Sequence, residues 1–371
     1  MKKKIAIWMP GGVGGGYYSQ GIPVISKLID DLSSDFQISI YTLYPTNDDF
    51  QPNGYKIFSI NKKIKINWLR WSLLTFLFLK HHCQKKYNLL YAFWGFPTGF
   101  LVVVLSKILK RPSVIHLQGG DAIYIPSINY GSLKGFNKKL MIWAYNHCST
   151  LIALTNFQKD KLITIGVTIP IEVIPFGPDQ NLFKFKENFV FHHPVRFLHV
   201  GNLLPVKDQI TLLNSFALIA NKISCEIRII GEDHLKGSVQ RHCEKLNLQD
   251  KTEFNGIQPY DKMPFHYAWA DILLVTSVYE GQCLAVSEAA ASGVMIAGTR
   301  TGIVSDWGDR CVVIAEVGGV EQLARNILNV IERPEVIAAL IMNANSEILF
   351  KNRTWTFKKI GEQINRLTPI S

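Results

Sequence analysis

The sequence lacks any apolar run long enough to cross a bilayer, which would need about 20 consecutive apolar residues. The stretch 92–109 is interrupted by Pro97, by two glycines and by Lys107. The apolar run that follows the N-terminal lysines ends at Pro10, which is too early for the core of a signal peptide. We therefore expect a cytoplasmic protein with a first buried strand at residues 5–9.

Several nucleotide and metal signatures are also missing. The sequence has no G-x-x-x-x-G-K-[ST] and no G-x-G-x-x-G, so neither a P-loop nor a nicotinamide-dinucleotide site is predicted. It has no D-x-D, which argues against a diphosphate chelated through a metal ion. No nucleic-acid-binding module is recognisable. The six cysteines are scattered without a C-x-x-C pair, and we expect them to be reduced and mostly buried.

Acidic residues are unevenly distributed. Residues 1–190 carry 22 Lys and Arg against 10 Asp and Glu, whereas residues 191–371 carry 18 against 19. No acidic residue lies between Asp49 and Asp121. This basic stretch is either a solvated cationic face or a surface for an anionic partner, such as a membrane or an acidic substrate.

Residues 68–79 form an apolar segment within this basic stretch. Two tryptophans, Trp68 and Trp71, stand at its start, and lysines flank it on both sides. The segment is too short to span a bilayer and predicts an amphipathic helix. That helix is either an ordinary core helix or one that lies in the plane of a membrane surface.

The distribution of apolar residues predicts an α/β fold. Apolar residues make up 47% of the chain and charged residues 19%, which is enough for sizeable cores. Short β-branched runs alternate with helical periods, pause at residues 184–194 and then restart. Such alternation is typical of parallel sheets with crossover helices. We predict two Rossmann-like, doubly wound domains: residues 1–188 with the terminal helix 354–371, and residues 189–353.

Ligands of doubly wound sheets bind at the carboxyl ends of the strands, so a two-domain version predicts a site in the cleft between domains. The glycine-rich stretch Gly11–Gly16 follows the first expected strand and precedes a helix expected from about Ser19. It is either a flexible turn or a loop that faces a phosphate or sugar. His116 and Asp121 lie at another strand end, where polar side chains could contact a ligand.

Two motifs in the second half carry the strongest signal. Lys207 stands at an expected helix start, where a cation could meet a diphosphate. Glu280 lies in a loop after the expected strand 272–275, and Glu288 lies eight residues later in the next helix. Amides of the loop and of the helix start form an anion site between two carboxylates, which can accept hydrogen bonds from sugar hydroxyls.

At this point the chain resembles the family 4 retaining glycosyltransferases, which have the GT-B fold. The stretch from Glu280 to Glu288 fits the E-x7-E motif of that family and is followed by EAAASG. Further matching segments run along almost the whole chain. They are HLQGGD, ALTNFQKDKL, VIPFGPDQNLF, HVGNLLPVKD, IIGEDH, FNGIQP, GTRTGIVSD and a terminal helix beginning near Trp355.

The resemblance implies a role for each matched residue. Glu280 would contact the transferred sugar, and Glu288 would bind the ribose hydroxyls. Lys207 would neutralise the diphosphate, and His116 would lie beside the donor sugar. The other implied contacts are the backbone of Gly281, Gln282, Cys283 and Leu284 with the sugar and diphosphate, Ile257 with the nucleobase, and Gly14 and Gly15 with the phosphates; Asp121 is placed with the acceptor.

One residue departs from the pattern. The family usually has an arginine beside the phosphate-binding lysine, at the position of Asn202 here. Either another cation replaces it, with Arg300 as the candidate, or charge on the leaving diphosphate is stabilised less. This departure also keeps open a non-catalytic saccharide-binding protein on the same fold.

The implied reaction is a metal-independent transfer with retention, and it needs no cofactor. The donor would be a UDP- or GDP-linked sugar. The acceptor would be a saccharide or a lipid-linked saccharide in surface-polysaccharide synthesis, taken by the basic N-terminal domain. An anionic membrane surface would then hold the protein at the inner face of the membrane, although a soluble acceptor such as a sugar phosphate is the alternative.

Overall fold

The computed structural model describes residues 2–60 and 64–369, and the chain divides into two compact units. Unit 1 comprises Met1–Leu154, Gln158–Pro175 and Thr354–Ser371, and unit 2 comprises Thr155–Phe157 and Phe176–Arg353. The expected boundary after residue 188 was therefore placed too late. Phe183 is buried in the core of unit 2, and Phe176 exchanges backbone hydrogen bonds with the side chain of Gln282, which ties residues 176–188 to that unit.

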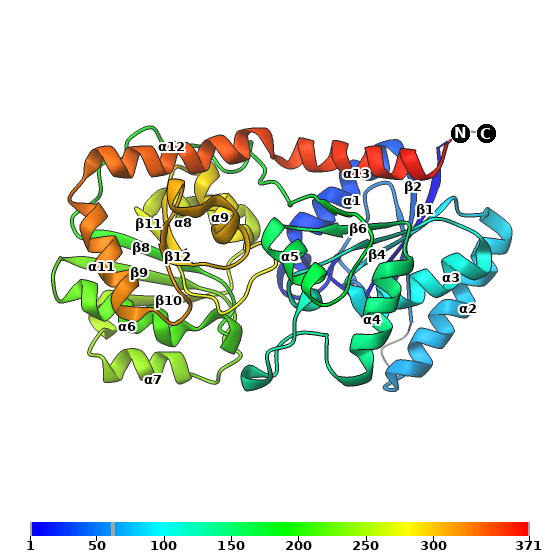
Figure 1. Ribbon diagram of the computed structural model, residues 1–371, viewed down its shortest axis with the longest axis horizontal. Helices are drawn as coiled ribbons and strands as arrows, with labels where there is room; N and C mark the ends of the chain where they lie inside the picture. Colours follow the sequence, from blue (N-terminus) through cyan, green and yellow to red (C-terminus); the bar gives the residue numbers. More distant parts are fainter. Residues whose placement is uncertain (1, 61–63, 370–371) are drawn as a thin grey trace. The chain divides into compact units, whose positions relative to one another are not determined.

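Unit 1 is built on a parallel sheet of seven strands within the described residues (Figure 1). The strand order is β3-β2-β1-β4-β5-β6-β7, and Ile7 of β1 pairs with Ile40 of β2 and Tyr91 of β4. The strands are β1 (Lys4–Met9), β2 (Gln37–Thr42), β3 (Lys56–Ser59), β4 (Leu89–Phe93), β5 (Ser113–His116), β6 (Thr150–Ala153) and β7 (Ile171–Val173). The short edge strand β3 was not expected from the sequence.

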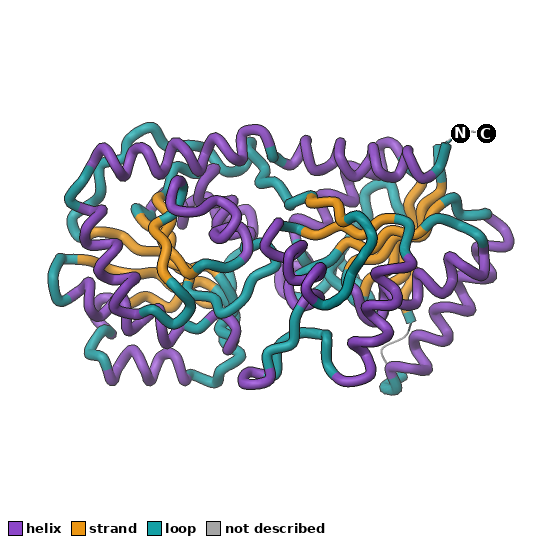
Figure 2. Tube along the Cα trace, in the orientation of Figure 1, coloured by secondary structure: helices purple, strands orange, loops and turns teal. Residues whose placement is uncertain are grey.

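Helices cover the sheet of unit 1 on both faces, as the tube in Figure 2 shows. They are α1 (Pro23–Asp35), α2 (Asn67–Lys85), α3 (Phe100–Leu109), α4 (Gly135–His147), α5 (Asn156–Thr164) and α13 (Arg353–Leu367). Helix α1 begins four residues later than expected, because residues 17–19 form a separate 3₁₀ turn and Pro23 starts the helix. Helix α3 begins directly after the turn Gly95–Gly99.

Unit 2 contains a parallel sheet of six strands among the described residues, in the order β10-β9-β8-β11-β12-β13. The strands are β8 (Val195–Val200), β9 (Cys225–Ile230), β10 (Thr252–Gly256), β11 (Ile272–Val275), β12 (Met295–Thr299) and β13 (Val313–Ala315). The helices are α6 (Gln209–Ala220), α7 (Ser238–Lys245), α8 (Met263–Trp269), α9 (Leu284–Ala291), α10 (Gly302–Trp307), α11 (Val320–Ile331) and α12 (Pro334–Phe350).

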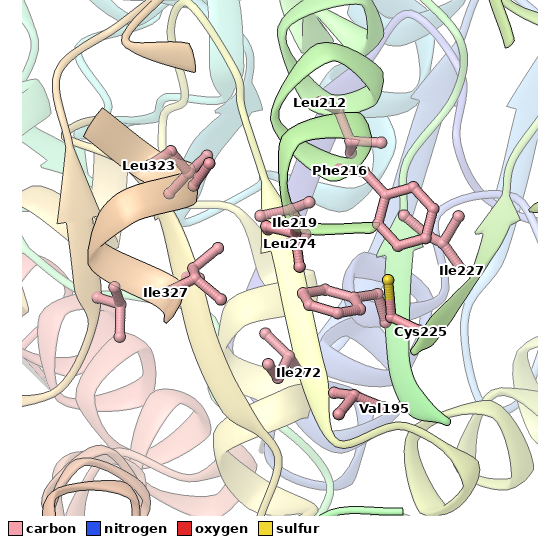
Figure 3. Packing of buried hydrophobic residues seen from close by; sticks show 14 of the residues in the cluster. Val195, Leu212, Phe216, Ile219, Cys225, Ile227, Ile272, Leu274, Leu323 and Ile327 are labelled. Carbon is pink, nitrogen blue, oxygen red and sulfur yellow. The ribbon is translucent and has the colours of Figure 1, made fainter. Parts of the chain in front are cut away.

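Unit 2 has two core clusters in the described residues, and one of them forms where α6 and α11 pack against the same face of the sheet (Figure 3). Phe216 of α6 is fully buried and its ring meets that of Phe197 on β8, with centroids 5.5 Å apart. Leu323 and Ile327 reach the sheet from α11. Burial of such side chains supplies the main favourable contribution to folding and fixes the strand ends that carry the loops.

Each sheet reverses its strand order at one point, between β1 and β4 in unit 1 and between β8 and β11 in unit 2. Loops that follow two such strands diverge to opposite faces and leave room for a ligand at their carboxyl ends. The loop after β8 leads to Lys207, and the loop after β11 leads to Glu280. The glycine-rich loop follows β1. The topology thus places three of the predicted segments at switch points.

Helix α2 extends beyond the amphipathic segment predicted at residues 68–79. Arg70, Leu74, Phe78 and His82, spaced four residues apart, are buried along one face. On the other face Trp68 and Phe76 are 69% and 70% exposed. No helix in the described part of the chain is long and apolar enough to cross a membrane.

Candidate functional site

The switch point of unit 2 brings together two of the predicted site residues. Nζ of Lys207 lies 2.5 Å from Oε1 of Glu280, and both side chains are largely buried. Lys207 ends the 3₁₀ turn Pro205–Lys207 after β8, whereas Glu280 comes from the loop after β11. Chain segments 73 residues apart therefore meet in a charged pair at the carboxyl ends of the two central strands.

The two loops are joined by hydrogen bonds beneath this pair. The hydroxyl of Thr276 donates to the carbonyls of Lys207 and Asp208, at 3.1 and 2.9 Å. The amide of Val278 donates to the carbonyl of Val206 at 2.8 Å. The hydroxyl of Ser277 donates to the same oxygen of Glu280 that accepts from Lys207, at 2.6 Å. The Glu280 carboxylate is thus held from two sides before any ligand arrives.

The segment from Gly281 to Leu284 presents amides that lack acceptors. Among the described residues, the amides of Gly281, Gln282, Cys283 and Leu284 donate to no protein oxygen. Gly281, Gln282 and Cys283 are buried, and a buried amide without a partner is costly unless a ligand satisfies it. Helix α9 starts at Leu284, so its N-terminal amides add partial positive charge. The arrangement can accept an anion.

Carbonyls and side chains keep this segment in place. The carbonyl of Gly281 accepts from the hydroxyl of Thr155 at 2.7 Å. The side chain of Gln282 is 3% exposed and bonds both backbone groups of Phe176. The side chain of Gln282 thus holds the segment that begins at Phe176 against the loop. Only the backbone amide of Gln282 is left to contact a ligand.

Glu288 lies one turn inside α9 and is 7% exposed. The hydroxyl of Tyr267 donates to its Oε2 at 2.7 Å, and Tyr260 also bonds the carboxyl group. Burial raises the pKa of Glu288 to about 7, although the two tyrosine hydroxyls act in the opposite direction by stabilising the charged form. A carboxyl group so placed can bind hydroxyls and changes charge near neutral pH.

The remaining predicted residues of unit 2 lie in different surroundings. Asn202 uses Oδ1 to accept from the amide of Glu232 at 3.1 Å, which links the loops after β8 and β9. Nε of Arg300 pairs with Glu316 at 3.0 Å. The predicted role of Arg300 as the replacement for the missing arginine stays a prediction. Ile257 follows β10 and is partly exposed.

His116 ends β5 in unit 1 and is completely buried. Its Nδ1 lies 2.8 Å from the hydroxyl of Tyr91 on β4. Burial lowers the pKa of His116 to about 3, so the imidazole is neutral throughout the physiological range. It can exchange a hydrogen bond with a neutral group, but it supplies no positive charge to a phosphate.

Asp121 is also completely buried, and its role in the structure is local. Oδ2 accepts from the amide of Gln118 at 2.8 Å and closes the turn Gly119–Ala122. The carbonyl of Asp121 accepts from the hydroxyl of Tyr145 at 2.9 Å. Burial raises the pKa of the carboxyl group to about 6. The predicted acceptor contact of Asp121 stays a prediction.

The two glycines predicted to face phosphates differ in their accessibility. Gly14 has φ +60° and is buried; a Cβ there would lie 2.2 Å from the ring of Phe50. Its carbonyl accepts from the amide of Asn47 at 2.7 Å. Gly15 is partly exposed, and the nearest atom to a Cβ at this position would be the carbonyl oxygen of Pro45, at 3.7 Å. Glycine at 14 is required by packing, whereas Gly15 has room for a ligand.

Three residues of the site carry no signal that the sequence analysis used. Ser277 binds Glu280, and Tyr260 and Tyr267 bind Glu288. Ser277 lies three residues before Glu280 in the same loop, but serine is too common in loops to indicate a functional residue. The tyrosines precede Glu288 by more than 20 residues and meet it through the tertiary fold. Among the described residues, no group of three or more His, Cys, Asp or Glu is placed to hold a metal ion.

Comparison with known proteins adds the family. The family "Glycosyl transferases group 1" matches residues 181–347 of this chain, and the family "Glycosyltransferase Family 4" matches residues 28–182. Among curated relatives, the amylovoran biosynthesis glycosyltransferase AmsK of Erwinia amylovora is 23% identical over 58% of this chain and 56% of its own length. AmsD of the same organism is 21% identical, over 73% of this chain and 74% of its own length.

Similar solved structures share the fold over nearly the whole chain. Sucrose-phosphate synthase from Thermosynechococcus elongatus superposes with a TM-score of 0.83 at 16% identity and 99% coverage of both chains. Anabaena HepE in complex with UDP and glucose has a TM-score of 0.75 at 18% identity, with 98% of this chain and 100% of that chain covered. The chain therefore belongs to the group 1, family 4 glycosyltransferases and has their GT-B fold.

Proposed function

We propose that this glycosyltransferase moves a sugar from a nucleotide-sugar donor to a saccharide acceptor with retention of anomeric configuration and without a metal ion. The observation that carries the proposal is the charged pair of Lys207 and Glu280 next to four amides that lack acceptors. A diphosphate offers several oxygens that such amides and a lysine bind well, and a hexose offers hydroxyls to a carboxylate.

In the proposed reaction, an acceptor hydroxyl forms a bond to the anomeric carbon while the bond from that carbon to the diphosphate breaks. Negative charge grows on the diphosphate, where Lys207 and the amides of the segment from Gly281 to Leu284 stabilise it more strongly than in the ground state. The leaving phosphate oxygen takes the proton from the acceptor. No protein group is then needed as a general base.

Glu280 would orient the transferred sugar from its position between Lys207 and Ser277. The hydrogen bond to Glu280 holds the ammonium group of Lys207, and the lysine would exchange part of this contact for the diphosphate when the donor binds. Glu288 would bind the ribose hydroxyls, with Ile257 beside the nucleobase. His116, being neutral, would serve as a hydrogen-bonding partner for the donor sugar.

The relatives and solved structures support a choice of donor and acceptor to test. HepE has been solved with UDP and glucose, which makes UDP-linked hexoses the first donors to test, with GDP-linked sugars next. AmsK and AmsD act in amylovoran biosynthesis, a relationship that favours a surface polysaccharide. We propose a lipid-linked saccharide as the acceptor, taken by the basic unit 1 at the inner face of a membrane. No cofactor is needed.

The test uses purified full-length protein and a panel of UDP-, GDP- and ADP-sugars, with release of the nucleoside diphosphate as the readout. We expect slow hydrolysis of one donor class, and the same rate after treatment with a metal chelator. Glu280→Ala should reduce the rate at least 100-fold while the far-ultraviolet circular dichroism stays unchanged. Turnover of no donor, or full activity of Glu280→Ala, would contradict the proposal.

A further inference from the structure

A long part of unit 1 exposes no acidic side chain. Between Asp49 and Asp160 the sequence contains one acidic residue, Asp121, and that residue is completely buried. The surface that residues 50–60, 64–154 and 158–159 of unit 1 form in the described structure is therefore free of carboxylates. This extends the acid-free region well beyond the stretch that ends at Asp121, because helix α4 is included.

The basic residues of this region do not all face solvent. Arg70 is buried and its guanidinium donates to the carbonyl of Leu43. Lys85 is partly buried over the ring of Phe58. Within residues 50–60 and 64–159, the exposed lysines are Lys56, Lys65, Lys80, Lys86, Lys107, Lys110, Lys134, Lys138 and Lys139. The exposed charge of this surface is thus entirely positive.

Helix α2 presents an apolar outer face despite being anchored on its inner face. Leu74 and Phe78 lie in the core with Trp8, whose ring meets that of Phe78 at 5.2 Å. Trp68 and Phe76 are separated by two helical turns on the outer side, where each is about 70% exposed. A helix that has already buried one face against a sheet gains nothing within unit 1 from aromatic residues on the other.

The neighbouring helices of the same layer continue this pattern. Helices α2 and α3 share one core cluster, and Phe100 of α3 contacts Trp143 of α4, with ring centroids 5.9 Å apart. Phe136 of α4 is 71% exposed, and Ile108 near the end of α3 is 68% exposed. Lysines stand beside both, namely Lys107, Lys110, Lys134, Lys138 and Lys139.

We propose that the outer side of this helical layer docks on an anionic lipid bilayer. The docking surface consists of Trp68, Phe76 and Lys80 of α2, Lys107, Ile108 and Lys110 at the end of α3, and Phe136, Lys138 and Lys139 of α4. The aromatic and aliphatic side chains enter the boundary between headgroups and acyl chains, and the lysine ammonium groups contact lipid phosphates. Apolar side chains among the lysines favour a bilayer over a purely anionic polymer.

This inference deepens the proposed function and rests on its lipid-linked acceptor, because docking would hold unit 1 at the surface where that acceptor lies. Binding to vesicles and turnover of a donor sugar are nevertheless separate measurements. Failure of vesicle binding with normal donor hydrolysis would overturn the docking surface alone. Vesicle binding without any hydrolysis would instead count against the proposed transfer.

The experiment is flotation of the full chain with vesicles of phosphatidylcholine alone or mixed with phosphatidylglycerol, at low and high salt. We expect binding to the mixed vesicles at least tenfold stronger than to neutral ones, and weakened by salt. Trp68→Ser with Phe76→Ser should reduce binding at least tenfold. Phe350→Ser, which removes an equally exposed aromatic ring from α12, should leave it within twofold. Equal binding to both vesicles, or unchanged binding of the double variant, would overturn the proposal.

Charge is tested separately with lysine variants. Lys80→Gln with Lys107→Gln should weaken binding to mixed vesicles about fivefold per lysine. Lys222→Gln with Lys245→Gln, which removes the same charge from exposed positions of unit 2, should weaken it less than twofold. An equal loss in both double variants would show a general attraction of the basic protein and would overturn the assigned surface.

Insertion of α2 can be measured without relying on loss of binding. Cys83 is the one exposed cysteine among six, so Cys83→Ser permits selective labelling of Phe76→Cys with an environment-sensitive dye. With mixed vesicles, the emission maximum of the dye should shift to shorter wavelength. Lipids that carry a quencher in the upper acyl chain should quench its fluorescence. An unchanged spectrum on vesicle-bound protein would overturn insertion at this position.

Discussion

The hydroxyl of Tyr267 donates a hydrogen bond to Oε2 of Glu288 across 2.7 Å, inside a region where the carboxyl group is almost inaccessible to solvent. Burial opposes the charge on Glu288, and the tyrosine supports it. The balance leaves the pKa near 7, where small changes of pH alter the charge of the group that we propose to bind ribose. Donor binding should therefore depend on pH in the neutral range.

We predict that donor affinity rises with pH through about 7 and then levels off, because the ionised carboxylate accepts hydrogen bonds from both ribose hydroxyls. Calorimetric titration with the nucleoside diphosphate between pH 5.5 and 8.5 measures this. Glu288→Gln should bind more weakly and show no such step. Tyr267→Phe removes a bond to the charged form and should move the step to higher pH. A step that persists in Glu288→Gln would assign it to another group.

The same group makes stability depend on pH in a direction opposite to that of a salt-bridged carboxylate. The pKa of Glu288 is higher in the folded chain than the ordinary value of 4.5, so the folded state holds the proton longer than the unfolded one. The contribution of Glu288 to the free energy of unfolding should fall as pH rises from about 4.5 to 7, by on the order of 3 kcal/mol, and stay constant above. Urea unfolding of the wild type and Glu288→Gln at several pH values measures the difference between their free energies of unfolding, which should become independent of pH below pH 4.5.

The core of unit 2 offers a matched pair for stability. Phe216→Ala should lower the free energy of unfolding by about 3–5 kcal/mol, because the ring is fully buried against β8 and leaves a cavity. Leu218 lies in the same helix, but its side chain is 39% exposed. Leu218→Ala should therefore lower the free energy of unfolding by less than about 1 kcal/mol. Urea unfolding of the full chain compares them. Equal losses would contradict the inference that burial of Phe216 against β8 stabilises unit 2 more than the exposed side chain of Leu218 does.

The fold could be predicted from the sequence because hydrophobic periodicity is local. Apolar runs such as residues 195–200 and 272–275 predict parallel strands, which are buried on both faces. The short edge strands Lys56–Ser59 and Val313–Ala315 were not predicted, because they contain too few residues to show a hydrophobic period. The start of α1 was misplaced because a 3₁₀ turn intervenes after the glycines.

The site was predictable only where chemistry and spacing coincide in the chain. Lys207 and Glu280 each follow a central strand, and the switch-point rule brings them together. The burial of Asp121 could not be predicted. An aspartate that closes its own turn and an aspartate that faces a ligand can stand in the same local sequence. The domain boundary was predicted after residue 188 instead of after Pro175, because Phe176 is tied to Gln282, which lies more than 100 residues away in the sequence.

Ser277 is expected to position Glu280 rather than to contact the reacting atoms. Ser277→Ala should lower kcat for donor hydrolysis about tenfold, since a hydrogen bond to a charged group is lost, while KM for the donor changes less than twofold. Ser277→Thr retains the hydroxyl and should recover most of the rate. A rise in KM without a fall in kcat would indicate that Ser277 contributes to donor binding instead. Thermal unfolding of each variant reports any loss of folding.

Asn202 allows the contribution of a second cation to be measured by gain rather than loss. Its side chain is exposed, follows β8 and lies in the same loop region as Lys207. Asn202→Arg should lower KM for the nucleotide sugar and raise kcat/KM about tenfold, because an added guanidinium would share the diphosphate charge with Lys207. Asn202→Leu removes the bond to the amide of Glu232 without adding charge, and it should lower activity or leave it unchanged. In the double variant Asn202→Arg with Lys207→Met, the arginine should restore part of the activity lost in Lys207→Met alone. If Asn202→Arg brings no gain in either background, the diphosphate does not approach the loop after β8 as proposed.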